Sequence, residues 1–415
     1  MNPEKQFPLP WRVHVIAVGM LFSLVGDAAA ALGLALDAAH SGTSWNVADV
    51  YVAGLVPPIL FAPLIGVLAD RWRARRLWIV SLLAQAVALG AATVLPALHF
   101  RIAMLAVAGI FGVAASAVGF KLLPDLAGSE HLSRANSAVS VANSASGLLG
   151  PALGATAHAI WGSTALLGFD TSSFLVIAGA AVIAVPASSA QATVKSHPFR
   201  GASAGFRALR ESSVIGPMLP LLIGLMLATS IEGVAGVFYI RDVVGNDTWY
   251  GYVLACWALG SIPGAVLAGK GSLKGRQGQL VAIGAGMISA GLLVAGLVPN
   301  GFVIAAAFIF AGLGNGAHNV AVRNSIHSTV PETFHGQAWA AYSATSRASV
   351  LIGYVLGTPN AALTSRTLVI ASGALPLALT LGVSFLLWRR SAGQALQVAV
   401  GEPEAGQEKR GSLSA

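Results

Sequence analysis

The stretch Gly66-Val-Leu-Ala-Asp-Arg-Trp-Arg-Ala-Arg-Arg76 places four arginines and one aspartate between two long apolar segments. A short basic turn of this kind is typical of a cytoplasmic connection between two membrane-spanning helices. The composition agrees, because 55% of the residues are hydrophobic and only 10% are charged, whereas soluble proteins carry about 25% charged residues. We therefore interpret the chain as an integral membrane protein.

Apolar runs separated by turns and charges predict an all-α membrane protein with twelve spanning helices. Residues 277–322 contain no Lys, Arg, Asp or Glu, and the turn Pro299-Asn300-Gly301 divides them into two segments. Each segment is close to the ~20 residues that cross a ~30 Å hydrocarbon core. The predicted spans are 12–37, 46–70, 75–97, 101–123, 134–160, 165–187, 214–240, 248–270, 278–298, 301–327, 336–357 and 364–388.

The basic residues predict the orientation of these spans. If the N-terminus is cytoplasmic, 20 of the 24 Lys and Arg residues fall in cytoplasmic segments. Three residues, Arg101, Arg241 and Arg366, fall in outer loops, and Arg347 falls inside a helix. Because cytoplasmic loops are enriched in Lys and Arg, we expect a multi-pass protein of a bacterial plasma membrane with both termini in the cytoplasm.

The chain divides into two similar halves. We expect a six-helix bundle over residues 1–187, a cytoplasmic linker over 188–213, a second six-helix bundle over 214–390 and a disordered cytoplasmic tail over 391–415. Gly150-Pro-Ala-Leu-Gly154 and Gly353-Tyr-Val-Leu-Gly357 occupy corresponding places 203 residues apart. Related halves are typical of transporters that alternate access to a central site, although Gly- and Ala-rich helices also look alike by chance.

These residues resemble the major facilitator superfamily over roughly residues 10–390. Its signature positions between helices 2 and 3 are matched by Gly66, Asp70, Arg71, Arg75 and Arg76, with Arg73 in place of the usual second glycine. The segment Gly147-Leu-Leu-Gly-Pro-Ala-Leu-Gly154 resembles the glycine-proline motif of exporters and antiporters. Leu122-Leu-Pro-Asp-Leu-Ala-Gly128 and Arg241-Asp-Val-Val-Gly245 resemble the branch of bacterial siderophore and macrolide exporters.

The resemblance implies roles for both motifs. Asp70 and its arginines would hold the cytoplasmic side of the transporter closed, or would form only a charge cluster that sets topology. Gly147, Gly150 and Gly154 would let helix 5 approach a neighbour closely at the interface of the halves, and Pro151 would let it bend. The arginine that many proton-coupled exporters carry within helix 4 is missing, because residues 103–120 contain no basic residue.

Charged side chains inside a membrane are costly and are therefore candidates for function. Asp27 and Glu232 are candidate proton carriers, or else structural partners of Arg347 or residues close enough to the outer interface to stay hydrated. Asn315 and His318 are also candidates for the proton or substrate pathway, and His318 relays protons, contacts substrate or simply packs. For Arg347 we favour a pair with a carboxylate over binding of an anionic substrate. We interpret Asp170 as a residue at the outer end of helix 6.

Among the aromatic residues, Trp257, Trp339 and Tyr342 are candidate substrate contacts. The sequence contains no phosphate-binding glycine loop followed by Lys-Ser or Lys-Thr, no pair of His or Cys at metal-site spacing, no convincing catalytic set, and no basic and aromatic cluster suited to nucleic acid. We therefore expect no enzyme activity, cofactor or metal. The expected partners are a small-molecule substrate and membrane lipids, and we expect a monomer.

The function that fits these observations is a secondary active transporter, driven by the proton gradient, that exports an amphipathic small molecule by alternating access. Two alternatives stay open. One is an importer or facilitator of a small metabolite, and the other is a non-transporting membrane receptor or scaffold on the same fold.

Overall fold

The computed structural model describes residues 10–41, 43–128, 132–185, 200–246, 248–269, 276–331 and 334–401, and all regular structure in these ranges is helical. The helices are α1 Trp11–His40, α2 Trp45–Arg71, α3 Ala74–Val94, α4 Leu98–Ala127, α5 Leu132–Ala184, α6 Arg200–Glu211, α7 Ile215–Val244, α8 Thr248–Ala268, α9 Gln277–Leu297, α10 Gly301–Thr329, α11 His335–Leu356 and α12 Ser365–Gly401.

Helix α5 contains two of the predicted spans. Gly162 has φ 74° and ψ 176°, which is not helical, and it separates the segment before it from the segment that ends at Ala184. Glycine is suited to this break because it lacks the Cβ that penalises positive φ. With α5 counted as two spans and α6 set aside, the twelve predicted spans are all present. Nine helices in the described ranges are long and apolar enough to cross a membrane.

Local signals explain several helix ends. The side chain of Asn300 accepts hydrogen bonds from the backbone N–H groups of Phe302 (3.0 Å) and Val303 (3.2 Å), as an N-cap of α10. Gly245 ends α7 in the left-handed conformation at φ 72°. Helix α12 continues to Gly401, into the tail that we expected to be disordered, because Ala, Gln and Leu at residues 392–399 favour helix. Residues 402–415 lie outside the described ranges.

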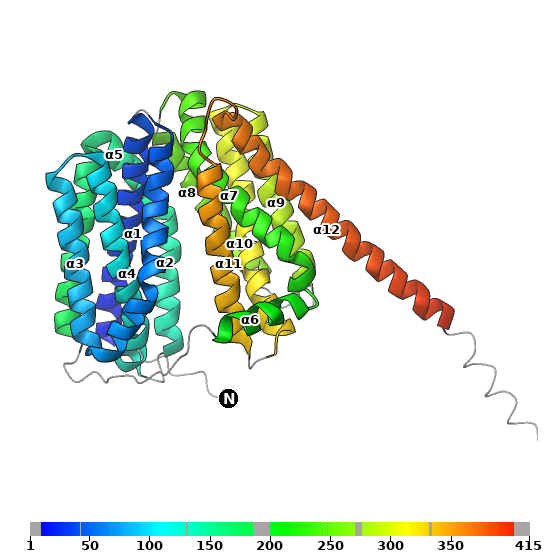
Figure 1. Cartoon of the computed structure of the whole chain (residues 1–415), viewed down its shortest axis with the longest axis horizontal. Helices are drawn as coiled ribbons and strands as arrows, with labels where there is room; N and C mark the ends of the chain where they lie inside the picture. The colour runs from blue at the N-terminus through cyan, green and yellow to red at the C-terminus, as the bar shows by residue number, and fades with distance from the viewer. Residues whose placement is uncertain are drawn as a thin grey trace, which may run out of the picture.

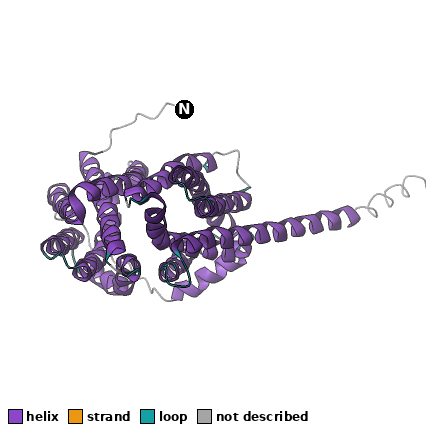
Figure 2. Ribbon diagram, turned by 90° about the horizontal axis from the view of Figure 1, so that it is seen from above, coloured by secondary structure: helices purple, strands orange, loops and turns teal. Residues whose placement is uncertain are grey.

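The helices form two bundles side by side (Figures 1 and 2). Helices α1–α5 pack on one another on one side, and α7–α12 pack on one another on the other side. Helix α6 falls within the predicted linker and packs against α11 and α7 at one end of the second bundle. The boundaries that we expected for the halves stay a prediction, but the division into two six-span halves is confirmed.

The two halves repeat one helix contact. A Cβ added at Gly154 of α5 would lie 2.7 Å from Cα of Ala29 in α1, so the two backbones are in close contact. A Cβ added at Gly357, 203 residues later, would lie 2.6 Å from the carbonyl oxygen of Ile231 in α7. In each half, the glycines of this helix therefore pack against the first helix of the same half.

We call the ends of the bundles that the charges place outside the cell the outer ends. Hydrogen bonds between described residues join the halves at these ends. Ser44 Oγ donates to the carbonyl oxygen of Pro359 (2.6 Å), and Arg241 Nη1 donates to that of Ala39 (2.9 Å). A further contact joins Thr156 Oγ1 and Tyr252 Oη (3.1 Å). The outer ends are therefore closed against each other.

Candidate functional site

Asp27 lies near the middle of α1, and its side chain is exposed to a cavity inside the N-terminal half. The cavity has a volume of about 270 Å³ and is lined by residues of α1, α3, α4 and α5. Most of its wall is apolar. Besides Asp27, the residues that line it include Ser23, Gln85, Ser116, Trp78 and Phe174. The expected membrane-embedded carboxylate therefore borders an internal space large enough for a small molecule.

Asp170 lies beside Asp27, and our interpretation of it as a helix-end residue was wrong. Asp170 is 1% exposed and lies in the second segment of α5, eight positions after the break at Gly162. Its carboxyl group is in hydrogen-bond contact with that of Asp27. A Cβ added at Gly26 would lie 2.5 Å from Asp170 Oδ1, so glycine at 26 leaves the room that the Asp170 carboxyl group occupies. Two carboxyl groups therefore meet between α1 and α5.

Glu232 lies on α7 near the junction of the halves. It is 6% exposed, and its Oε1 atom has no hydrogen-bond partner among the described residues. Tyr250 of α8 packs beside it, and its hydroxyl donates to the carbonyl oxygen of Gly233 (3.0 Å). Tyr51 of α2 contacts Tyr250 through a side-chain hydrogen bond and stacks on Tyr354 of α11 at 5.0 Å between ring centroids. We call Tyr51, Tyr250 and Tyr354 the tyrosine cluster.

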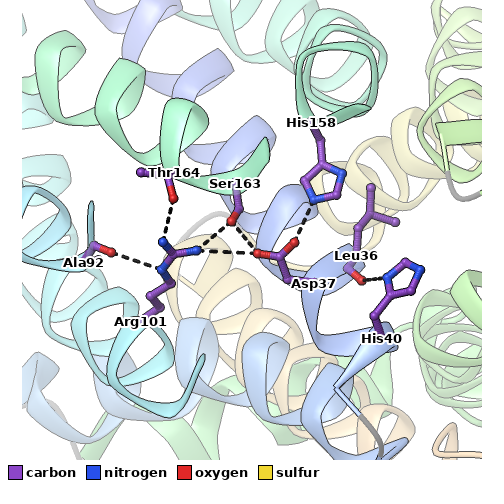
Figure 3. Close-up of polar contacts among 8 residues, drawn as sticks. All are labelled: Leu36, Asp37, His40, Ala92, Arg101, His158, Ser163 and Thr164. Atoms are coloured by element: carbon purple, nitrogen blue, oxygen red, sulfur yellow. Dashed lines mark hydrogen bonds and ion pairs between the residues drawn. The ribbon is translucent and has the colours of Figure 1, made fainter. Parts of the chain in front are cut away.

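A second charged group, which the sequence analysis missed, lies at the outer end of the N-terminal half (Figure 3). We call Asp37, Arg101, His158 and Ser163 the outer ion cluster. Asp37 Oδ1 lies 2.8 Å from His158 Nε2, and Asp37 Oδ2 lies 3.6 Å from Arg101 Nη1 and accepts a hydrogen bond from Ser163. The cluster ties α1, α4 and both segments of α5 together.

Arg101 is central to the outer ion cluster. We expected it in an outer loop, but it lies in the first turn of α4 and is 6% exposed. Its guanidinium donates to Ser163 Oγ (2.7 Å), to Thr164 Oγ1 (2.6 Å) and to the carbonyl oxygen of Ala92 (3.1 Å). The only sequence signal was an isolated charge beside an apolar run, and its partners lie 9 to 64 residues away.

The signature loop between α2 and α3 is described only in part. For Gly66, Asp70 and Arg71 the structure gives the backbone but no side-chain surroundings. Arg75 Nη2 donates to the carbonyl oxygen of Val182 (2.7 Å), near the end of α5, and Arg76 is exposed. Arg75 therefore donates a hydrogen bond to a carbonyl oxygen in the last turn of α5, within its own half. The closing contact that we expected from Asp70 stays a prediction.

The glycines of the helix 5 motif do not all contact the same neighbour. Gly150 and Gly154 pack against α1 in the same half, and not across the interface of the halves as we expected. This helix meets the second half where the carbonyl oxygen of Pro151 and the methyl group of Ala155 pack against Gly251 of α8. Gly147 has no atom of another part of the chain within 4 Å of an added Cβ. One face of this helix therefore supports its own bundle, and another face meets the second bundle.

His318 packs between α10 and α9. It is 1% exposed, and its Nδ1 lies 3.1 Å from the carbonyl oxygen of Val281. This geometry favours the packing interpretation over a proton relay. Asn315, three residues earlier, turns instead to α8, where its Nδ2 donates to Ser261 Oγ (3.3 Å).

Arg347 is exposed on α11 and forms no ion pair within the described part of the chain, so the carboxylate pair that we favoured is not formed. It lies seven residues, about two helical turns, from Tyr354, whose ring contacts α2. It therefore shares the face of α11 that is turned toward the other half.

The three aromatic candidates lie in the C-terminal half. Trp257 contacts the ring of Phe308 in α10 at 5.9 Å between centroids. Trp339 lies 5.5 Å from the ring of Tyr342 and is exposed, and the guanidinium of Arg323 lies 5.3 Å from its centroid. None of the three lines the cavity that contains Asp27.

The sequence matches the family profile described as Major Facilitator Superfamily over residues 13–354. A search of curated protein sequences finds no match.

Solved structures of transporters share the fold at low sequence identity. The nucleoside transporter NupG superposes with a TM-score of 0.71 at 12% identity, covering 91% of this chain and 98% of that chain. A bacterial homologue of the iron transporter ferroportin, in an inward-facing state, gives 0.69 at 17% identity, covering 90% and 98%. A peptide transporter POT in complex with sulfate gives 0.70 at 13% identity, covering 93% and 96%. At these identities the likeness shows the fold alone.

Proposed function

The chain belongs to the Major Facilitator Superfamily, and from this premise we propose that it is a secondary transporter that exports an amphipathic small molecule in exchange for protons. The observation that carries the proposal is the position of Asp27, a membrane-embedded carboxylate exposed to an internal cavity. A charge inside a membrane is costly and is retained where it has a function. Binding and release of a proton there links the proton gradient to the state of the transporter.

Glu232 is the second carboxylate in this proposal. It lies beneath the tyrosine cluster, where α2, α8 and α11 meet across the two halves. A buried carboxylate whose Oε1 atom has no hydrogen-bond partner among the described residues is costly when ionised, so its protonation favours the closed outer end. In the orientation that the charges predict, the structure corresponds to a state closed toward the outside. Alternating access then requires the outer contacts to break and the cytoplasmic ends to come together.

The direction and the substrate class of the proposal rest on sequence. The segment Gly147–Gly154 resembles the motif of exporters, and Trp339 and Tyr342 offer aromatic surface for a bulky apolar ligand. We place the protein in a bacterial plasma membrane as a monomer with both termini in the cytoplasm. The proton gradient supplies the energy.

The proposal is tested by a transport screen in an efflux-deficient bacterial host, with and without a protonophore. We expect expression of the chain to lower the accumulation of at least one amphipathic compound, and the protonophore to abolish this effect. A compound found in this way then allows measurement of flux in inverted vesicles. Flux in the opposite direction would make the chain an importer, and gradient-independent flux would make it a facilitator. The absence of any substrate-dependent flux would favour a receptor or scaffold.

Two substitutions test the roles of the carboxylates. We expect Asp27→Asn and Glu232→Gln each to lower proton-driven export by about tenfold or more, because neither amide takes up or releases the coupling proton. Asp49→Asn is the matched control, because Asp49 is an exposed carboxylate near the start of α2. Thermal unfolding in detergent checks that each variant folds. Normal coupled export by both Asp27→Asn and Glu232→Gln would contradict the assignment.

A further inference from the structure

Helix α6 has no part in the proposed transport mechanism, yet it is held firmly at the end of the second bundle that the charges place in the cytoplasm (Figure 1). Leu209 is fully buried. A Cβ added at Gly205 would overlap the carbonyl group of Gln337 in α11, and a Cβ added at Gly216 of α7 would overlap that of Arg210. Close backbone contacts therefore fix α6 against both α7 and α11.

Helix α6 lies against the flanks of α7 and α11, and not only beneath their ends. Leu209 lines one small gap together with Leu222 of α7 and Thr345 of α11. Leu222 is seven residues into α7 and Thr345 is ten residues into α11, or about 10 Å and 15 Å along the helix axes.

The flank of α11 that α6 covers continues into a surface suited to lipid. Thr345 shares a face of α11 with Ile352, seven residues later, whose side chain is 51% exposed. At about 100° per residue, Ile352 points away from Tyr354, whose ring contacts α2 of the other half. The face of Ile352 is therefore turned to the bilayer, and α6 covers the cytoplasmic part of that face.

The outward face of α6 combines an aromatic ring with two cations. Phe206 is 43% exposed, and Arg207 and Arg210 are also exposed. The three lie within about 100° of one another around the helix, on the side turned away from Gly205. Neither arginine forms an ion pair within the described part of the chain. Glu211, at the last position of the helix, is exposed as well, so the face keeps a net positive charge.

This face is complementary to the inner surface of a bacterial plasma membrane. Anionic headgroups attract basic residues that lie near that surface, and a guanidinium group binds phosphate oxygens through paired hydrogen bonds. Interfacial helices place aromatic rings at the boundary between headgroups and acyl chains. Because α6 covers a lipid-facing flank, the same position brings Phe206, Arg207 and Arg210 to this boundary.

We propose that the face formed by Phe206, Arg207 and Arg210 binds the headgroup of an anionic phospholipid of the inner leaflet. The two arginines bind its phosphate, and the ring of Phe206 packs against the first carbons of its acyl chains. Through α6, the bound lipid ties the cytoplasmic part of α11 to the membrane surface. This inference goes beyond the proposed function, because it does not depend on what the chain transports or in which direction.

The first experiment measures lipid preference with the purified full-length protein in detergent. Thermal unfolding is followed during titration with dioctanoylphosphatidylglycerol, which is anionic, or with dioctanoylphosphatidylcholine, which has the same chains and no net charge. A ligand that binds the folded state raises the unfolding temperature. We expect the anionic lipid to act at a concentration about tenfold lower than the neutral one, and inorganic phosphate to have no effect. Equal stabilisation by the two lipids, or by inorganic phosphate, would overturn the proposal.

Two substitutions locate the site. We expect Arg207→Gln and Arg210→Gln each to weaken binding of dioctanoylphosphatidylglycerol about fivefold, the effect of one basic residue near an anionic surface. Both side chains are exposed, so we expect the variants to fold. Arg276→Gln is the matched control, because Arg276 is exposed just before α9 at the same end of the bundle. An equal loss in all three variants would show a general effect of charge and would contradict the assignment to α6.

A second measurement places Phe206 relative to the bilayer. Phe206→Cys in a Cys256→Ala background carries one cysteine, which is labelled with bimane and reconstituted in nanodiscs that contain phosphatidylglycerol. We expect lipids brominated on their acyl chains to quench the label more strongly than iodide in solution does. Quenching by iodide alone would show that the face is turned to water, toward a soluble partner, and would overturn the proposal. Neither measurement requires transport, so both are independent of the transport screen.

Discussion

The two halves repeat the same helix contacts but treat their charges differently. In the N-terminal half, Asp27 meets Asp170, and Asp37 is held by Arg101 and His158. In the C-terminal half, Glu232 has an unpartnered oxygen and Arg347 forms no ion pair among the described residues. Charges in the first half are connected across several helices, whereas these two charges of the second half are isolated.

This difference indicates that the two halves have different roles. Connected charges hold α1, α4 and α5 in fixed positions around the cavity, as a binding site requires. Glu232 and Arg347 form no ion pair among the described residues, so no such pair has to break when the halves move. They are free to form new contacts in the other state. We therefore expect the N-terminal half to bind and the C-terminal half to move relative to it.

The largest expected effect tests the connected charges. Removing one partner of a buried ion pair leaves an unpaired charge, at a cost of about 3–5 kcal/mol. Because Asp37 is part-exposed, with 35% of its side chain accessible, we expect Arg101→Ala to lower the free energy of unfolding by about 3 kcal/mol. The measurement is a denaturant titration in detergent micelles.

Arg347→Ala is the counterpart in the C-terminal half. Arg347 is exposed and forms no ion pair with another described residue, so we expect its removal to change the free energy of unfolding by less than about 0.5 kcal/mol. An equal loss of free energy of unfolding in Arg101→Ala and Arg347→Ala would contradict this difference between the halves.

A smaller effect tests the packing that the halves share. In Gly154→Leu the added Cβ would lie 2.7 Å from Cα of Ala29, a backbone atom that cannot rotate away. Overpacking of this kind costs about 1–3 kcal/mol. Gly147→Leu, on the same helix with no neighbour within 4 Å of its added Cβ, is the matched control and is expected to leave stability unchanged. Thermal unfolding of the two variants in detergent compares them, and equal stability would show that α5 and α1 separate easily.

The smallest effect concerns the contact between the halves. Tyr51→Phe keeps the ring that stacks on Tyr354 but loses the hydroxyl contact with Tyr250. A hydrogen bond of this kind contributes about 1 kcal/mol, so we expect the outer end to open about fivefold more often. The alkylation rate of Val47→Cys in a Cys256→Ala background measures this opening, because Val47 is buried near the start of α2.

Tyr252→Phe is the matched variant for Tyr51→Phe. The Tyr252 hydroxyl also contacts the other half, at 3.1 Å from Thr156, but this contact is exposed. We expect a smaller increase in alkylation, because exposed hydrogen bonds are replaced by water. A larger increase for Tyr252→Phe than for Tyr51→Phe would show that the tyrosine cluster does not hold the outer end closed.

Much of the fold was predictable because a membrane imposes it. Apolar runs of spanning length have no stable alternative to helix in lipid, so the twelve spans and the two halves followed from hydropathy and charge. The packing role of Gly150 and Gly154 also followed, because small residues allow close approach. The partner helix did not follow, since α1 and α8 both offer small residues to the same segment.

The candidate site was predictable only in part. Asp27 and Glu232 stood out as carboxylates in apolar helices, and both lie in buried or enclosed places in the structure. Asp170 and Arg101 did not stand out, because each lies near the end of a predicted span, where a charge is ordinary. Their significance depends on partners far along the chain, Asp27 for Asp170 and Asp37 for Arg101.

By itself, the sequence determined that this chain crosses the membrane as helices in two similar halves, because hydropathy and spacing are local properties that lipid converts directly into structure. Only the tertiary structure decided which charges meet. That outcome depends on how helices from distant parts of the chain rotate and approach one another, as α1 and the second segment of α5 do when they bring Asp27 to Asp170.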